Sequence, residues 1–599
     1  MPTLYCDVIR PPTQAISPME PPVFHRYSPV LCQAVTITLE TIVHDIERLA
    51  GDDACNSDAL IRIAAEYMLA CDTPHYDTEP LIPELGARLR QGDRDAKASR
   101  QRQGAFYTPP ILVGFILDHT LTPWHAAHPD RTPIVLDPSC GTGRFLLAAG
   151  ERLVEHRQAS TGECAFAAWQ HVGPHLLGLD SDPIATAWLT ARLTSLAGGD
   201  CDAARGIRTL DALSPEGIPA CKADIVVGNP PFGSPLKSAS DAESARAAAR
   251  SFGRPVGRYT DLAAIFLGLA RTAITKQGYL GMVQPLSMLA ARDAAPIRAA
   301  LREVCTLTTA WASGRHVFDA SVYTCALVFK HNAPADTFHV ERYRDLPIQP
   351  CPPITISATD DSWASLATAA IGFPDVPPHQ TGGTLGDICQ ATADFRDQYY
   401  GLKPAIEECG DPIDEDVVPV VTTGVLDAAR CHWGHRPIRL FGQEWSKPGI
   451  RIPALSESMR SWATTRLVPK IMLPTQTRTL EPVLDITGHW LPSVPIITIT
   501  TTRPDDLARI GAVLACPLIS LVAIHRFLGT ARNPKAIKLS ARDVLMLPTP
   551  ADTDAWDAGA DSFRLAQEAV TQEQCDEHLA DCAAHMSTAY AVKKAIGPQ

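Results

Sequence analysis

One turn constrains the fold of this chain more than any other feature. The apolar run TPIVLD leads into Pro138-Ser139-Cys140 and then Gly141-Thr142-Gly143, and the segment GRFLLAAGERLVEHR that follows has helical periodicity. Glycines at such a turn let the backbone approach a ligand closely, and the first amides of the next helix point toward it. A strand, a glycine turn and a helix in this order predict a doubly wound α/β domain, in which ligands bind beyond the carboxyl ends of the strands.

The same alternation of short apolar runs and amphipathic segments continues from about residue 104 to 335. We expect strands in HLLGLD, GIRTLD, ADIVVG, GYLGMVQP and YTCALVFK, and helices in PIATAWLTARLTSLA and YTDLAAIFLGLARTAIT. Strands that alternate with helices predict a parallel sheet covered by helices. The expected architecture is therefore a Rossmann-like α/β domain.

An acidic residue ends each of the first three expected strands: Asp137, Asp180 and Asp211. A carboxylate repels a pyrophosphate but pairs with an α-ammonium, and this is where S-adenosylmethionine differs from a nicotinamide dinucleotide. We therefore assign Asp137 to the methionine end, Asp180 to the ribose hydroxyls and Asp211 to the adenine amino group. The alternative for each residue alone is a buried structural acid, a helix cap or a turn, and Asp182 is expected to cap the helix that Pro183 opens.

A second motif, Asn229-Pro230-Pro231-Phe232, follows the expected strand ADIVVG. The Asn229 side-chain carbonyl and the Pro230 backbone carbonyl can accept both N–H bonds of an aryl amine, which exposes the nitrogen lone pair to an electrophilic methyl group. The two prolines stiffen the loop, and Phe232 offers a face for stacking on a planar ring. The motif alone could equally be a rigid surface turn. Behind a cofactor turn it indicates methyl transfer to an amino nitrogen.

The charge of the chain is unevenly distributed. The formal net charge is −13, but from Arg430 to Arg542 we count sixteen Lys and Arg against six Asp and Glu. After residue 550 the sequence holds nine acids against three bases. This asymmetry marks the basic segment as the part that faces a polyanion, although basic domains also bind acidic proteins.

Length and pattern divide the chain into segments. A chain of 599 residues is expected to form two to four domains. We expect a helical N-terminal region over 1–100, the α/β domain over 101–345, an α+β domain over 380–550 that carries the basic excess, and an acidic helical tail over 551–599. The Pro-rich stretch near 347–380 is expected to be the linker.

The sequence indicates no membrane segment and no metal site. No run of eighteen apolar residues occurs, and the start MPTLYCDVIRPPTQ lacks the charged leader and apolar core of a signal peptide. The 17 cysteines are scattered without a C-x-x-C pair, so neither a zinc site nor disulfides are expected. We expect a cytoplasmic, nucleoid-associated protein of a bacterium.

With these motifs in place, the chain resembles the amino-methylating DNA adenine methyltransferases of the γ arrangement, the TaqI-type and type IIG modification enzymes. In these the cofactor motif precedes the catalytic motif, and a C-terminal target-recognition region follows. The resemblance is close over roughly 104–335 and loose over 380–550. It implies a class I methyltransferase domain with S-adenosyl-L-methionine as cofactor. The segment from Gly104 to Pro110 resembles the leading motif, which adds Tyr107 and Thr108 to the pocket. The cofactor-binding residues are then Tyr107, Thr108, Asp137, Pro138, Gly141, Gly143, Asp180 and Asp211.

The resemblance also implies how DNA is bound. Adenine inside a duplex cannot reach such a pocket, so the family extrudes the base. Phe318 resembles the aromatic that packs on the extruded ring, which implies that Phe232 and Phe318 sandwich it. Arg258 is the last of four arginines in the segment 233–258. The resemblance implies phosphate contacts there, and a solvated helix face is the alternative. The region over 380–550 resembles the TaqI-type specificity domain, which implies contacts with phosphates or base edges from Arg478, Arg526, Arg532, Lys535 and Lys538.

Other readings stay open at this point. RNA-base and protein-glutamine methyltransferases use similar Asn-Pro-Pro motifs, and cytosine N4 is an alternative target. A DNA-binding component of a phage-defence complex that acts through partners is an alternative of another class. A separate restriction or defence subunit is a further partner that the resemblance allows, beside double-stranded DNA.

Overall fold

The structure is a computed structural model that describes residues 108–233, 256–257, 260–318, 322–332, 334–394, 396–531, 533 and 535–592. The helical region expected over 1–100, Tyr107, Arg258 and Arg532 lie outside the described residues. Two compact units divide the described chain, and they are treated separately below. The first holds residues 134–211, and the second holds 108–133 and 212–592.

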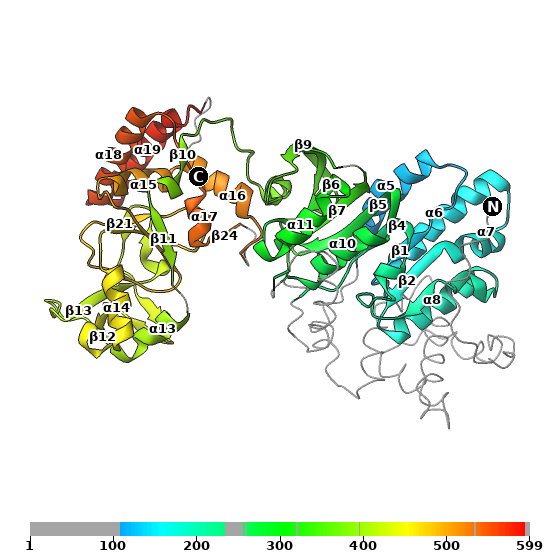
Figure 1. Cartoon of the computed structure of the whole chain (residues 1–599), viewed down its shortest axis with the longest axis horizontal. Coiled ribbons are helices and arrows are strands. Elements are labelled where there is room, and N and C mark those ends of the chain that lie inside the picture. Colours follow the sequence, from blue (N-terminus) through cyan, green and yellow to red (C-terminus); the bar gives the residue numbers. More distant parts are fainter. Residues whose placement is uncertain are drawn as a thin grey trace, which may run out of the picture. The chain divides into compact units, whose positions relative to one another are not determined.

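The first unit contains parallel strands with helices packed beside them (Figure 1). Its strands lie in the order β3-β2-β1, with Asp137 opposite Gly178 and Asp180 opposite Thr209. All three carboxyl ends therefore lie at one edge. Its elements are β1 (Val135–Asp137), α6 (Arg144–Thr161), α7 (Ala165–Val172), β2 (Leu176–Asp180), α8 (Pro183–Leu196) and β3 (Ile207–Thr209).

Local chemistry sets the ends of these helices. α6 follows Gly143, whose φ of 87° lies in the left-handed region, and it ends at Gly162, whose φ is 73°. Residues other than glycine rarely adopt this backbone conformation, so a glycine marks each end of α6. Pro183 is the first residue of α8, and the Asp182 carboxylate accepts a hydrogen bond from the Ile184 N–H at 3.0 Å. The helix cap predicted for Asp182 is confirmed.

The second unit begins with a larger sheet, in the order β4-β5-β7-β6-β8-β9. β4 pairs parallel with β5, β7 is antiparallel to both β5 and β6, and β6 is parallel to β8. The elements are α5 (Pro110–Ala127), β4 (Ala223–Gly228), α10 (Leu262–Ala273), β5 (Ile274–Pro285), α11 (Ala295–Arg302), β6 (Cys305–Ala312), β7 (Thr324–His331), β8 (Thr337–Arg344) and β9 (Gln349–Ser357).

Helices cover both faces of this sheet. A Cβ added to Gly281 of β5 would lie 2.7 Å from Ile116 of α5, so this face packs directly on α5. Three residues along, the Gln284 side chain donates to the Ala263 carbonyl of α10 at 3.0 Å. Residues three apart in a strand point to opposite faces. The doubly wound α/β architecture predicted from the sequence is confirmed.

One expectation about the boundary of this domain is wrong. The Pro-rich stretch near 347–380 does not begin as a linker, because β9 pairs antiparallel with β8, with Thr337 opposite Ser357. β9 is the outermost strand of the sheet. A proline in a strand lacks the N–H that a ladder needs, and it is tolerated where that side has no neighbouring strand. Pro350, Pro352 and Pro353 therefore fit an edge strand.

The rest of the second unit is the mixed region predicted over 380–550. Two four-stranded sheets, β11-β23-β19-β21 and β12-β18-β13-β22, lie beside helices. The main elements are β11 (Gln390–Ala393), α13 (Arg396–Leu402), β12 (Ile406–Glu408), β13 (Val417–Val421), β18 (Pro448–Arg451), α14 (Glu457–Arg466), β19 (Lys470–Pro474), β20 (Gln476–Thr477), β21 (Val483–Asp485), β22 (Leu491–Pro492), β23 (Ile496–Thr500), α15 (Asp506–Ala515), α16 (Pro517–Phe527), β24 (Ile537–Lys538), α17 (Ala541–Leu545), α18 (Thr553–Glu568) and α19 (Gln572–Ala589).

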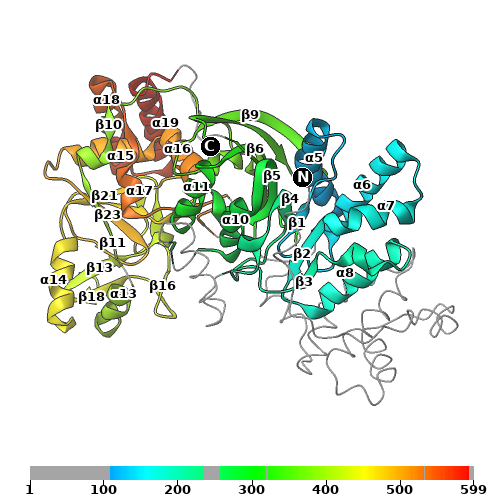
Figure 2. The ribbon, with the colours of Figure 1, turned by 45° about the vertical axis from the view of Figure 1, so that its right-hand side comes forward.

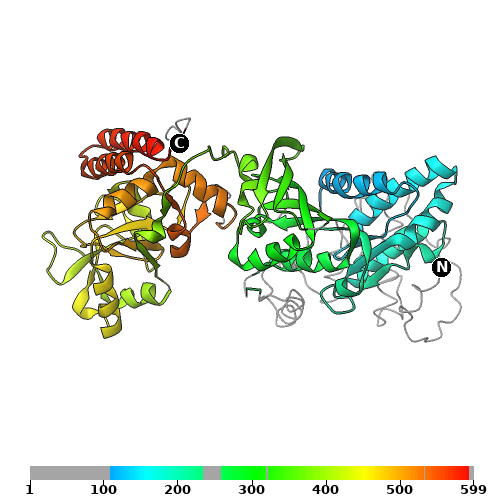
Figure 3. The same ribbon diagram turned by 45° about the horizontal axis from the view of Figure 1, so that its top comes forward.

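The acidic segment after residue 550 is helical, as expected. α18 and α19, drawn in red, lie side by side in all three views (Figures 1, 2 and 3). α18 packs so closely on α15 that a Cβ on Gly511 would lie 2.2 Å from the Phe563 ring. The run AIKLSARDVLML forms the two-residue strand β24 followed by α17. Ser540 and Asp543 form a capping box there, which ends the strand and starts the helix.

Among the described residues, no single helix is both long and apolar enough to cross a membrane. Only α15 and α16 together reach that length and composition, and they are bent by 65° at the break between them.

Candidate active site

The first candidate site is the carboxyl edge of the first unit. Asp137 ends β1, Asp180 ends β2, and the exposed Asp211 lies two residues after β3. The Asp180 carboxylate accepts from the Gly141 N–H and from the Asp182 N–H, both at 2.8 Å. Asp180 therefore fixes the glycine turn to the end of the neighbouring strand.

Asp137 is hydrogen-bonded to a residue of the turn that follows it. Its side chain is 2 % exposed, and one carboxylate oxygen accepts from the Ser139 N–H at 3.0 Å. Sequence reasoning assigned no role to Ser139. Its position two residues after an acid at a turn could have indicated the hydrogen bond from its N–H to the carboxylate. A carboxylate has about four acceptor positions, so Asp137 and Asp180 both keep acceptor capacity for a ligand.

The electrostatics of this edge favour a bound cation. Burial raises the pKa of Asp137 to about 7; the Ser139 N–H opposes this shift, and the charge of Asp180 adds to it. The pKa of Asp180 is also raised, chiefly by burial. Within the part of the chain that the structure describes, neither acid forms an ion pair with Lys or Arg. An α-ammonium placed here would favour the charged form of Asp137.

The glycine turn leaves room for a ligand on one side only. A Cβ added to Gly141, whose φ is 52°, would meet nothing within 4 Å. At Gly143, by contrast, it would lie 2.3 Å from Leu189 of α8. Gly141 therefore faces open space, whereas Gly143 packs on a helix. Two acids with acceptor capacity and an open glycine fit S-adenosylmethionine, so the donor set agrees with the cofactor that the sequence predicts.

The second candidate site, in the second unit, is the loop that follows β4, whose six residues are all buried. Pro230 is buried, and the side-chain oxygen of Asn229 is shielded from solvent. The parallel register of Gly228 with Met282 places this loop at the carboxyl edge of β4 and β5. Thr108 is also buried, directly before α5, the helix that packs on β5.

A residue that sequence reasoning passed over anchors this loop. Asp261 is the N-cap of α10, where its carboxylate accepts from the Ala263 N–H at 3.0 Å. Its second oxygen accepts from the Gly233 N–H, also at 3.0 Å, and Gly233 accepts in turn from the Leu262 N–H at 2.9 Å. The loop is therefore tied to the start of α10. An acid before an apolar helix was the available signal.

The two aromatic rings do not form the expected sandwich. Phe232 and Phe318 are each 6 % exposed, and their centroids are 6.1 Å apart with planes at 80°. This is an edge-to-face contact. A base between two parallel rings needs about twice the stacking distance, so one ring must turn for a base to enter. The structure brings the two rings together, but in a different geometry from the one implied.

Three basic residues assigned to the recognition region lie on one ribbon. β20 pairs with β24, with Gln476 opposite Lys538, so exposed Arg478, Lys535 and Lys538 lie on or beside two adjacent short strands. Arg526 differs, because it donates to the Met546 carbonyl at 3.1 Å and is only partly exposed. Arg526 therefore has a structural contact at the end of α17.

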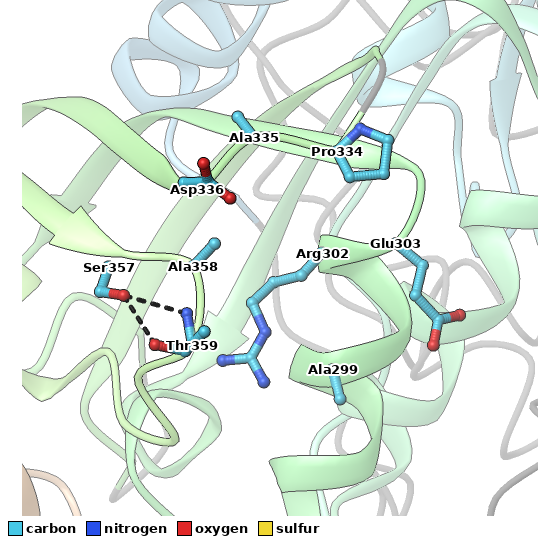
Figure 4. Close-up of a pocket in the computed structure, with 9 residues that line it drawn as sticks. All are labelled: Ala299, Arg302, Glu303, Pro334, Ala335, Asp336, Ser357, Ala358 and Thr359. Atoms are coloured by element: carbon cyan, nitrogen blue, oxygen red, sulfur yellow. Dashed lines mark hydrogen bonds between the residues drawn. The ribbon is translucent and has the colours of Figure 1, made fainter.

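A pocket of about 610 Å³ lies in the second unit. It is lined by the end of α11, the loop before β8 and the end of β9, with Arg302, Asp336 and Ser357 among its residues (Figure 4). β6 and β8 run parallel and both begin at this side, so the pocket lies at the amino edge of the sheet. The Asn-Pro-Pro-Phe loop lies at the carboxyl edge. The pocket is therefore separate from this loop.

Comparison with known proteins bears on this arrangement. Residues 93–344 match the model of the family described as N-6 DNA Methylase. The adenine-specific methyltransferase PglX of Streptomyces coelicolor is 34% identical over 122 residues, which is 20% of this chain and only 10% of PglX.

Among solved structures, the type IIL restriction-modification enzyme MmeI in complex with DNA is similar with a TM-score of 0.53 and 11% identity. That match covers 89% of this chain and 81% of MmeI, and at this identity it shows the fold. The motifs, the fold and the family match agree over the same residues. In its motifs, its fold and its family match, the segment 93–344 is similar to the N-6 DNA methylases.

Proposed function

We propose that this chain is a site-specific DNA methyltransferase that transfers the methyl group of S-adenosylmethionine to the exocyclic amino group of an adenine extruded from duplex DNA. The observation that carries the proposal is the Asn-Pro-Pro-Phe loop at the end of a buried strand, in a segment that matches the N-6 DNA methylase family. Buried Asp137 and half-buried Asp180 in the first unit both have raised pKa values, so a bound cation would stabilise their charged forms, and this supports the cofactor.

The cofactor supplies an electrophilic methyl group when it is bound. Asp137 would hold its α-ammonium, Asp180 its ribose hydroxyls, and Asp211 its adenine amino group. Thr108, Pro138 and Gly141 would line the same pocket, and Gly143 would keep the turn against α8. Because the acids fix the turn as well as the ligand, they orient the cofactor instead of reacting with it.

The chemistry at the substrate belongs to the loop after β4. The Asn229 side-chain carbonyl and the Pro230 carbonyl would accept the two N–H bonds of the target amino group. This removes lone-pair density from the ring and directs it to the incoming methyl, and the proton leaves after transfer. Pro231 stiffens the loop, and Phe232 with Phe318 would stack on the base after one ring turns. No strong base is required.

We assign the mixed region over 380–550 to target recognition, with Arg478 and Lys535 among its DNA contacts. The charge pattern supports this, since this region carries the basic excess of an otherwise acidic chain. Arg258, Arg532 and Tyr107 stay predictions from sequence. A separate restriction or defence subunit, and a bacterial nucleoid as the place of action, also stay predictions.

The test is methylation-aware long-read sequencing of a modification-free host that expresses the chain, beside a host that expresses Asn229→Ala. We expect N6-methyladenine at one defined motif, absent from the control. N4-methylcytosine at a motif would correct the target base. An unmodified genome, together with methyl transfer to RNA or to protein glutamine in vitro, would replace the proposal with one of those substrates.

A further inference from the structure

Resting on the proposed function, we propose that the basic loop, made of the described residues 528–531, 533 and 535–538, grips the phosphates that flank the extruded adenine and does not read base edges. Between residues 525 and 542 the chain has five Lys and Arg and no Asp or Glu. Lys535 and Lys538 are exposed, and neither forms an ion pair with an acid in the described part of the chain. Unpaired, exposed cations are available to phosphates.

The basic loop has a defined shape. Leu528 pairs with Ile537, and the Thr530 hydroxyl accepts from the Lys538 N–H at 2.9 Å and donates to the Phe527 carbonyl at 2.6 Å. Asn533 accepts from the Lys535 N–H at 2.9 Å. These contacts close the loop at its base and at its tip. Its charges are therefore held on a short ribbon.

The first end of the basic loop is fixed beside the catalytic edge. Gly529 has a φ of 91°, and a Cβ added to it would lie 2.6 Å from the carbonyl oxygen of Leu286. Leu286 directly follows Pro285, the last residue of β5. β5 ends at the same edge as β4, from which the Asn-Pro-Pro-Phe loop emerges. Only glycine fits this approach without displacement.

The second end is fixed by an ion pair. Arg292, six residues after Leu286, donates to the Ser540 hydroxyl at 2.7 Å and to the Asp543 carboxylate at 2.6 Å. The segment 286–292 that receives both ends is itself held in place. Buried Arg298 donates to the carbonyls of Met288 at 2.8 Å and Ala291 at 3.0 Å.

The same segment is hydrogen-bonded to the anchor of the catalytic loop. The Thr260 hydroxyl donates to the carbonyl of Asp293, the neighbour of Arg292, at 2.8 Å. The next residue, Asp261, holds the Gly233 N–H beside Phe232. A continuous set of contacts therefore joins the basic loop to the loop that grips the amino group.

This placement favours phosphate contacts over base reading. A nucleotide extruded into the Asn-Pro-Pro-Phe loop brings its own flanking phosphates to that edge. Lys535 and Lys538 are flexible point charges, which suit phosphates, whereas sequence is most often read by planar, bidentate side chains. The geometry therefore points to a backbone clamp for the target strand.

The experiment measures binding of the full chain to two duplexes over a range of salt concentrations. One duplex contains the recognition motif found by sequencing, in unmethylated form, and the other has random sequence. We expect Lys535→Ala/Lys538→Ala to weaken both to a similar degree and to lower the slope of log affinity against log salt by about two, since each phosphate contact contributes roughly 0.9. The sequence motif that this double variant methylates should be the same as for the wild type. Lys276→Ala is the matched control, an exposed lysine near the opposite end of β5.

A second variant tests the placement. Gly529→Ala keeps both lysines but forces the basic loop away from Leu286, so we expect KM for DNA to rise about tenfold with unchanged affinity for S-adenosylmethionine. A relaxed motif in the lysine variant would show base reading and overturn the proposal, as would an unchanged salt slope. If the wild type methylates no DNA, the proposed function fails, and the salt slope on random duplex still decides whether this loop binds phosphates.

Discussion

The glycine turn of the first unit and the Asn-Pro-Pro-Phe loop of the second both follow a parallel strand, but they are held in different ways. The turn is held by the buried carboxylate of Asp137 and the half-buried carboxylate of Asp180, and the pKa values of both are raised. The loop is held by two prolines, two aromatic rings and the Asp261 helix cap. The first arrangement depends on charge and therefore on pH, and the second depends on rigidity. Binding of the cofactor and activation of the substrate are thus sensitive to different perturbations.

The largest expected effect separates catalysis from cofactor binding. Asn229→Ala removes one acceptor of the target amino group, and we expect kcat to fall about 10²–10³-fold, the usual loss when one group that stabilises a transition state is removed. Affinity for S-adenosylmethionine should stay within about twofold. Single-turnover methyl transfer and calorimetric titration of the cofactor measure the two quantities. Equal losses in both would contradict the separation between the two regions.

The next effect is a gain of stability with a loss of binding. Asp137→Asn keeps an acceptor for the Ser139 N–H but removes a charge that burial disfavours. We expect the ligand-free protein at pH 8 to gain on the order of 2–4 kcal/mol in free energy of unfolding. Affinity for S-adenosylmethionine should fall about 10- to 100-fold, because an ammonium loses its partner. Denaturant titration and calorimetry measure both.

Asp182→Asn is the matched control, because asparagine still caps α8 and the charge change is the same. Both quantities should stay close to the wild type in this variant. A loss of stability in Asp137→Asn would mean that the carboxylate is charged and paired in the free protein.

The comparison also shows what sequence alone could predict. The glycine turn, α6, the Asp182 cap and the loop after β4 are encoded by neighbouring residues, so local patterns reveal them. The Asp261–Gly233 and Arg292–Asp543 contacts join residues 28 and 251 positions apart, and no local pattern reports them. The Pro-rich pattern of β9 predicts a linker, although prolines also occur on edge strands. The sequence does not show that β9 lies at the edge, because edge position is a property of the finished sheet. The edge-to-face rings depend on packing in the same way.

A pH dependence should mark the first region. The pKa of Asp137 is about 7 in the folded protein and 3.8 ordinarily. Between these values the folded state binds the extra proton, so the free energy of unfolding contributed by Asp137 is fully present below about pH 4 and is lost as pH rises to 7. Cofactor affinity should change in the opposite direction and rise between pH 6 and 7.5, as Asp137 ionises. Calorimetric titrations of the protein with S-adenosylmethionine at pH 6.5, in buffers of different ionisation enthalpy, should detect the proton that Asp137 releases on binding.

In Asp137→Asn the profile of affinity against pH should be flat over the same range. A profile that is flat in the wild type, or that falls as pH rises, would show that Asp137 does not meet the ammonium. Single-turnover rates at saturating cofactor should change little with pH, because the second region has no titrating group in the proposed chemistry.

The smallest effect tests whether rigidity itself serves catalysis. Asp261→Ala removes the cap of α10 and the tether of Gly233, and we expect a loss of about 1 kcal/mol in stability and about a tenfold fall in kcat. Asp552→Ala is the control, since Asp552 caps α18 by accepting from the Asp554 and Ala555 N–H groups at 3.1 Å. It should cost similar stability without the fall in kcat. Asp261→Asn, which keeps an acceptor for the cap, should recover most of the stability. If both alanine variants lose the same fraction of kcat, the tether acts only through stability. If Asp261→Ala alone loses it, the position of the loop limits the reaction, because the amino group must be held in line with the methyl group for the lone pair to reach it.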